Sequence, residues 1–139
     1  MMNVTITNAD RAETLLRALG DQLTLSGDAF HVVVVGGSAL LPLGQPEGFE
    51  ERLATREYGP ALTVSSASRL DQIHLKLYAT VDAGGPGKHE QDLRALEPTR
   101  DELVAAARWS RTHDPSEGYR EMLRDALAFL GVEDADLDA

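Results

Sequence analysis

The sequence predicts an α+β fold in which a small sheet of two or three strands packs with about five helices. Two stretches rich in β-branched residues, 30–35 and 61–68, predict strands, whereas apolar residues at helical spacing dominate the rest of the chain. A length of 139 residues with 42% hydrophobic residues predicts a single core. We therefore expect one domain over 1–132, followed by an acidic disordered tail at 133–139.

Strand and helix patterns alternate at the beginning of the chain. VTIT at 4–7 predicts a short strand, and a helix is expected from about Ala9. FHVVVV at 30–35 predicts a strand buried on both faces. After a Gly-Gly-Ser turn, SALLPLG at 38–44 predicts a helix of two turns. Residues 44–60 are punctuated by glycine and proline, and they predict no more than a helical turn or two.

The rest of the chain predicts one strand and then four helices. ALTVSSAS at 61–68 is the second clear strand. Ser68 caps a helix that continues to Asp82 and ends in the glycine-rich loop at 83–88. The remaining helices are expected at 89–96, at 99–110 with a Thr99–Glu102 capping box, and from about 116 to Leu130.

The composition argues against several classes of protein. No run reaches the ~18 apolar residues of a membrane helix, and the first residues predict no signal peptide. Cysteine is absent, which excludes disulfides and thiolate–metal sites. The net charge of −10 disfavours non-specific nucleic-acid binding and favours a basic protein partner. We expect a bacterial, cytoplasmic protein.

Gly36, Gly37 and Ser38 form the first candidate site. Glycines let the backbone approach a ligand closely, and the first N–H groups of the next helix attract anions. The turn can therefore hold a nucleotide phosphate. The alternative is a tight strand-to-helix turn with Ser38 as a cap, which is the commoner role of a short glycine motif.

Lys76 and Asp92 form the second candidate site. Lys76 lies beside the apolar stripe of its helix, where it can direct its charge at a phosphate or extend its stem along the core. Asp92 lies near the start of a helix, where a carboxylate also favours the helix dipole. GGPGK at 84–88 lacks the spacing of a phosphate-binding loop. His74 is expected in the core. The spacing of the histidines predicts no metal site.

Three stretches agree in order and spacing with a known family. They are VVVVGGSALL (32–41), LKLYATVD followed by KHEQDL, and LEPTRDELVAAARW (96–109). Together they resemble bacterial nucleotidyltransferase-like proteins akin to the AbiEii toxins of abortive-infection and toxin–antitoxin systems. The resemblance implies that Gly37 and Ser38 hold a nucleotide triphosphate, that Lys76 contacts phosphate, and that Asp92 supports the site. It also implies nucleotidyl transfer from an NTP, with Mg²⁺, to a hydroxyl of RNA or protein.

The chain departs from that family where the metal-binding carboxylates belong. In the family, a strand with Asp-x-Asp soon follows the Gly-Gly-Ser helix, and two carboxylates on one strand face can hold two Mg²⁺ ions. Here no aspartate lies between residues 29 and 70, and Glu50 and Glu51 are adjacent. Residues 44–60 are too few for the strand, helix and strand expected there. The sequence thus predicts a truncated nucleotidyltransferase-like sheet with an internal deletion.

Three functions are compatible with this pattern. The first is a nucleotidyltransferase-like protein that lacks metal-dependent catalysis and retains NTP or partner binding. The second is an active nucleotidyltransferase whose Mg²⁺ ligands come from Glu47, Glu50 or a second subunit. The third is a partner-binding module of a toxin–antitoxin pair. Because a small sheet has open edges, we also expect a homodimer, which light scattering would detect.

Overall fold

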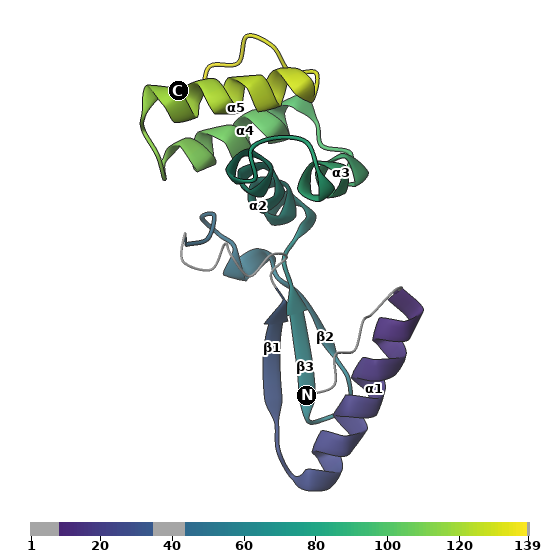
Figure 1. Cartoon of the computed structure of the whole chain (residues 1–139). Helices are drawn as coiled ribbons and strands as arrows, with labels where there is room; N and C mark the ends of the chain where they lie inside the picture. The colour runs from purple at the N-terminus through teal and green to yellow at the C-terminus, as the bar shows by residue number, and fades with distance from the viewer. Residues whose placement is uncertain (1–8, 35–43, 139) are drawn as a thin grey trace. The chain divides into compact units, whose positions relative to one another are not determined.

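The chain folds into two compact units, whereas its length predicts one domain. A computed structural model describes residues 9–34 and 44–138 (Figure 1). One unit, called the sheet unit, comprises residues 9–34 and 53–66, and the other, called the helical unit, comprises 44–52 and 67–138. The predicted α+β class is confirmed.

Five α-helices, one 3₁₀ turn and three strands make up the described residues. In chain order they are α1 (Ala9–Ser26), β1 (Phe30–Val34), η2 (Glu50–Arg52), β2 (Ala54–Glu57), β3 (Leu62–Ser66), α2 (Arg69–Asp82), α3 (Lys88–Ala95), α4 (Arg100–Arg111) and α5 (Glu117–Phe129). None of the described helices has the length and apolarity required to cross a membrane. The expected strand at 4–7 and nearly all of the expected helix at 38–44 lie outside the described residues.

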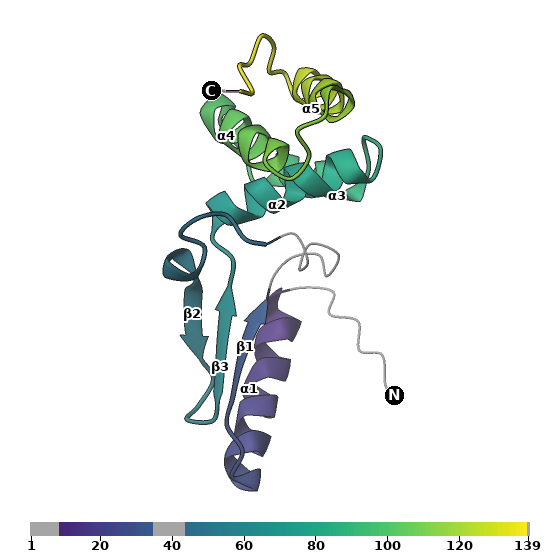
Figure 2. The same cartoon turned by 90° about the vertical axis from the view of Figure 1, so that its left-hand side faces the viewer.

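The three strands form a mixed sheet in the order β1-β3-β2. β1 runs parallel to β3, and β2 runs antiparallel to it. Val32, Val64 and Arg56 are register partners, so their side chains share one face. Nη2 of Arg56 lies 2.7 Å from Oε1 of Glu13 in α1, which shows that this face is the one covered by α1 (Figure 2).

β2 is the strand that the sequence pattern missed. Its four residues are all exposed, and they have neither apolar alternation nor a β-branched run. The helical turn expected in this region is confined to Glu50–Arg52. β2 is instead held by its backbone pairing to β3 and by Thr55, whose Oγ1 lies 2.7 Å from Oγ of Ser65. Tertiary pairing therefore outweighs local preference here.

α1 approaches the β2–β3 turn at Gly20. Gly20 is buried, and a methyl group at this position would overlap the carbonyl oxygen of Tyr58. The hydroxyl of Tyr58 in turn donates to Oε2 of Glu13 over 3.3 Å. Glycine inside a helix costs roughly 1 kcal/mol relative to alanine, but here it allows the helix and the turn to pack closely.

The sheet has open edges among the described strands. Within residues 9–34 and 44–138, β1 and β2 each pair with β3 only. Large apolar side chains of this unit also remain exposed, namely Leu15, Leu19, Leu25, Phe30 and Val32. Edge strands of this kind are commonly covered or paired. The expected homodimer is compatible with these features and stays a prediction.

The main core lies between α2, α3, α4 and α5. α2, α4 and α5 each contribute one apolar stripe with residues three or four positions apart, as an amphipathic helix requires, and the short α3 contributes Leu93. The buried residues of this core are Ile73, Leu77, Val81, Leu93, Leu103, Val104, Ala106, Ala107, Tyr119, Leu123, Leu127, Val132 and Leu137. Burying one leucine in such a core stabilises the fold by roughly 1.5–3 kcal/mol.

Residues 133–138 pack on the helical unit, in contrast to the disordered tail that their acidic composition predicts. Leu137 is 2% exposed and belongs to the core. Oδ2 of Asp138 lies 2.5 Å from Nη2 of Arg120, and Nε of Arg108 donates to the carbonyl of Asp136 over 2.8 Å. The buried Leu137 and the arginines Arg108 and Arg120 thus hold a segment whose acidic composition predicts exposure to solvent.

Glu102 joins the start of α4 to α2. It accepts the N–H of Thr99 at 2.8 Å and two guanidinium N–H groups of Arg69 at 2.7 and 3.1 Å. The hydrogen bonds from Arg69 have the largest effect on this carboxylate, followed by the backbone of Thr99, and together they lower the pKa of Glu102 to about 2.

The variant Glu102→Gln is therefore expected to lose stability at neutral pH and to converge with the native protein near pH 2. The carboxyl has its ordinary pKa of 4.5 in the unfolded chain, so the unfolded state takes up this proton first as the pH falls. The stabilisation is complete above about pH 4.5 and is lost as the pH falls to about 2. Urea midpoints of both proteins across this range measure the effect, and a pH-independent difference would contradict it.

Candidate functional site

The predicted site residues Lys76 and Asp92 meet where α2 packs against α3. Nζ of Lys76 donates to Oδ2 of Asp92 over 2.9 Å, although the residues are sixteen positions apart in the sequence. The side chain of Lys76 is 18% exposed, and that of Asp92 is 37% exposed. The pair therefore lies at the margin of the core, within reach of a ligand in solvent.

α2 positions Lys76 through its cap and its buried stripe. Ser68 is the N-cap of the helix, and its Oγ accepts the N–H of Asp71 at 3.1 Å. Ile73 and Leu77 are completely buried and fix the rotation of the helix about its axis. Lys76 lies beside this stripe, so its aliphatic stem can follow the core while the amine reaches α3.

α3 positions Asp92 through the buried side chain that follows it. Leu93 is completely buried in the helical core, which orients this short helix. Gly87 is the N-cap of α3 and makes no side-chain hydrogen bond to the helix. Asp92 lies one turn after Lys88 and faces α2.

Both lysines of the chain converge on Asp92. The sequence has 13 basic residues, and only Lys76 and Lys88 are lysines. Nζ of Lys88 lies 3.9 Å from Oδ1 of Asp92, and its side chain is 86% exposed. The hydrogen bond from Lys76 is the main cause that lowers the pKa of Asp92; partial burial opposes it, and the charges of Lys76, Lys88 and His89 add to it. Two cations thus surround one ionised carboxylate.

Gly36, Gly37 and Ser38, the other predicted site residues, lie outside the described residues. Glu47 and Glu50, the alternative metal ligands, are exposed in the segment 44–52. Among residues 9–34 and 44–138, no three carboxylates or histidines are grouped so that they could hold a metal ion.

An ion pair between a buried carboxylate and a partly exposed arginine of the helical unit is the polar cluster that sequence reasoning missed. Asp71 is completely buried, and Arg52 holds both of its carboxylate oxygens, with Nη2 at 2.5 Å and Nε at 3.0 Å. Oγ of Ser68 adds a contact of 2.5 Å. The hydrogen bond with Asp71 is also the main cause that raises the pKa of Arg52. Both carboxylate oxygens are occupied, so this cluster fastens the segment 44–52 to the start of α2.

The core position expected for His74 is confirmed. Its side chain is 9% exposed, and Nδ1 lies 2.8 Å from the carbonyl oxygen of Leu70. The ring makes an edge contact with Trp109, at 5.9 Å between centroids. His74 therefore has a structural role between α2 and α4, as its place on the helix stripe predicts.

No protein-family model, curated protein or solved structure matches this chain. The nucleotidyltransferase-like ancestry inferred from three sequence stretches accordingly stays a prediction. Independently of that ancestry, Lys76 and Lys88 place two ammonium groups beside Asp92. Two ammonium groups close to one another can bind an anion with more than one negative charge.

Proposed function

We propose that this protein is a nucleotidyltransferase-like protein that binds a nucleoside triphosphate at Lys76 and Lys88 without metal-dependent catalysis. The observation that carries the proposal is the convergence of both lysines of the chain on Asp92. The sequence resemblance independently assigns Lys76 to phosphate and Asp92 to its support.

The two lysines differ in a way that suits a triphosphate. Lys76 is largely shielded from water, so its charge is screened less than that of an exposed lysine. Lys88 is almost fully exposed and can contact an incoming anion first. A triphosphate carries more negative charge than Asp92 and offers several acceptors, so it can bind both ammonium groups while Asp92 keeps Lys76 in place.

The competing explanation is a plain ion pair between α2 and α3. With Asp92 more than one third exposed, such a pair stabilises the fold by ~1 kcal/mol or less. It predicts that Lys76 affects stability slightly and ligand binding not at all. The two explanations therefore differ in a quantity that binding experiments measure directly.

The absence of catalysis is inferred from the sequence of the sheet region. Two-metal nucleotidyl transfer requires carboxylates that hold the ions beside the triphosphate. No aspartate lies between residues 29 and 70, and β2, the described strand between β1 and β3 in the sequence, has the sequence ATRE with one glutamate, Glu57. Glu57 alone does not make the paired arrangement of Asp-x-Asp.

Lys76→Ala is expected to weaken ATP binding by at least about tenfold, because it removes the shielded cation of the site. Isothermal titration calorimetry with ATP, GTP, CTP and UTP, each with and without Mg²⁺, measures the affinity. Arg124→Ala is the matched control, since it removes the same charge from the exposed surface of α5. Failure of the native protein to bind any NTP at millimolar concentration would overturn the proposal, as would equal affinities of native protein and Lys76→Ala.

Chemical labelling and a transfer assay separate binding from catalysis. Because the chain has only two lysines, an acetylating reagent read by mass spectrometry reports on both, and ATP should protect them. The alternative of an active enzyme predicts label transfer from an NTP to RNA or protein with Mg²⁺, and loss of that transfer in Lys76→Ala. Such a result would replace the non-catalytic proposal.

A further inference from the structure

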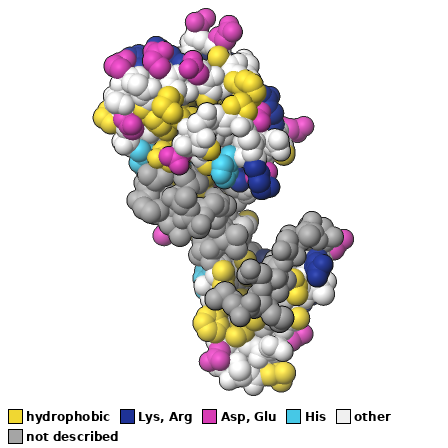
Figure 3. Space-filling model, viewed as in Figure 1, with side chains coloured by type: hydrophobic (Ala, Val, Ile, Leu, Met, Phe, Trp, Pro, Cys, Tyr) yellow, Lys and Arg dark blue, Asp and Glu magenta, His cyan; other side chains and the backbone are white. Residues whose placement is uncertain are grey.

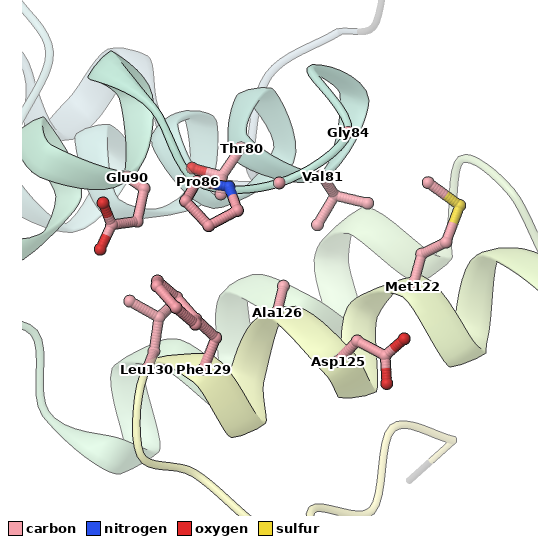
Figure 4. A pocket seen from close by; sticks show the side chains of 11 residues that line it. Thr80, Val81, Gly84, Pro86, Glu90, Met122, Asp125, Ala126, Phe129 and Leu130 are labelled. Carbon is pink, nitrogen blue, oxygen red and sulfur yellow. The ribbon is translucent and has the colours of Figure 1, made fainter.

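An apolar groove lies between α5 and the end of α2 with the loop that follows it. Its volume is about 280 Å³, and Figure 4 shows the side chains that line it. Most of its lining is apolar, and the main contributors are Val81, Pro86, Met122, Ala126, Phe129 and Leu130. We call this feature the α5 groove. It is independent of Lys76 and Lys88, neither of which lines it.

α5 has a second apolar face in addition to the one that it buries. Leu123 and Leu127 are at most 1% exposed and belong to the core. Met122, Ala126 and Phe129 follow one another at spacings of four and three, so they line one side of the helix next to the buried stripe, and Ala126 itself is partly buried against the core. Met122 is 46% exposed and Phe129 is 54% exposed. A surface helix needs one apolar face for its own packing, so the second face is available to a partner.

The unpaired charge at the groove is negative. Asp125 lines the groove beside Met122 and Phe129, is exposed, and has no ion pair among the described residues (Figure 4). Glu90 also lines it, but its charge is paired with Arg94, whose guanidinium lies over the ring of Phe129. Acidic and apolar side chains are likewise intermixed over the helical unit in Figure 3, and the chain carries a net charge of −10. The chemistry of the groove thus suits an occupant that is both apolar and cationic.

We propose that the α5 groove binds an amphipathic helix of a basic partner protein. The apolar face of that helix enters the groove against Met122 and Phe129, and a lysine or arginine at its margin meets Asp125. In helix-in-groove recognition an apolar groove binds the apolar face of an amphipathic helix, and the lining of the α5 groove is mostly apolar.

A synthetic amphipathic peptide of leucine and lysine tests the proposal with the full chain. Fluorescence anisotropy at a physiological ionic strength of about 0.15 M limits non-specific attraction. Phe129→Ala and Asp125→Lys are each expected to weaken binding at least about tenfold, because they remove the apolar contact and the charge partner. Asp21→Lys makes the same charge change on exposed α1 and should bind like the native protein. Circular dichroism establishes that each variant is folded.

Four outcomes would overturn the proposal. The first two are that the native protein does not bind the leucine–lysine peptide, or that it binds a leucine–glutamate peptide equally well. The other two are that Asp125→Lys and Asp21→Lys weaken peptide binding equally, or that neither Phe129→Ala nor Asp125→Lys changes it. Self-association that Phe129→Ala abolishes would identify a second copy as the occupant instead, and binding of an apolar dye without the peptide would identify a small-molecule site. The NTP titration is separate, so failure at Lys76 leaves this result interpretable.

Discussion

Arg52→Met is expected to lower the free energy of unfolding of the helical unit by far more than removal of an arginine from an exposed ion pair. Asp71 has no exposed surface and receives two hydrogen bonds from this guanidinium. The methionine leaves a buried carboxylate without its cation, and among the residues that the structure describes only Ser68 still donates a side-chain hydrogen bond to it. Chemical unfolding followed by circular dichroism measures the loss.

Two further variants show whether the buried charge causes this loss. Arg124→Met removes an arginine from an exposed ion pair on α5 and should change stability by about 0.5 kcal/mol or less. Adding Asp71→Ala to Arg52→Met should recover part of the loss, since the double variant no longer buries an unpaired carboxylate. A loss below about 1 kcal/mol in Arg52→Met would show that Asp71 is not held by Arg52 in solution.

Leu123→Ala is expected to cost about 2–5 kcal/mol of stability, whereas Met122→Ala should cost far less. Leu123 is completely buried between the helices, so its loss leaves a cavity that rigid neighbours fill only in part. Met122 is the adjacent residue on α5 but is 46% exposed, so its truncation leaves no enclosed space.

The comparison of these neighbours tests the division of α5 into two apolar faces. Urea unfolding of both variants gives the two free energies under the same conditions. Similar losses in the two variants would mean that the face with Met122 is buried in solution, and would remove the basis for a free α5 groove. A large loss in Leu123→Ala alone would leave the outer face open for a partner helix.

The helices were predictable because their signals are local. Thr99 and Glu102 form the expected capping box of α4, and Ser68 caps α2 as expected. β2 was not predictable, because four exposed residues carry no hydrophobic pattern and depend on pairing with β3. The packing of residues 133–138 was missed for a related reason. The burial of one leucine, Leu137, orders this segment although most of its residues are acidic, and composition alone does not reveal that burial.

The candidate site was predictable only as separate residues. Lys76 and Asp92 were singled out by their sequence context, and the structure places Nζ of Lys76 2.9 Å from Oδ2 of Asp92. The contribution of Lys88 was not anticipated, since it depends on the position of α3 relative to α2. The Arg52–Asp71 pair was missed because Arg52 lies in a segment without regular pattern, nineteen positions before its partner. Long-range polar contacts of this kind leave no periodic signal in a sequence.

The close contact at Gly20 fixes the position of α1, along its own axis, relative to the β2–β3 turn. A helix that rests on a sheet through an apolar stripe can shift along its axis by about one turn and present a similar stripe again, since residues four apart share a face. At the β2–β3 turn, however, a Cβ at the position of Gly20 would overlap the carbonyl oxygen of Tyr58, and the residues one turn away, Leu16 and Thr24, both carry a Cβ. Sliding in either direction would drive a side chain into a carbonyl group. One missing methyl group thus sets the alignment of an eighteen-residue helix.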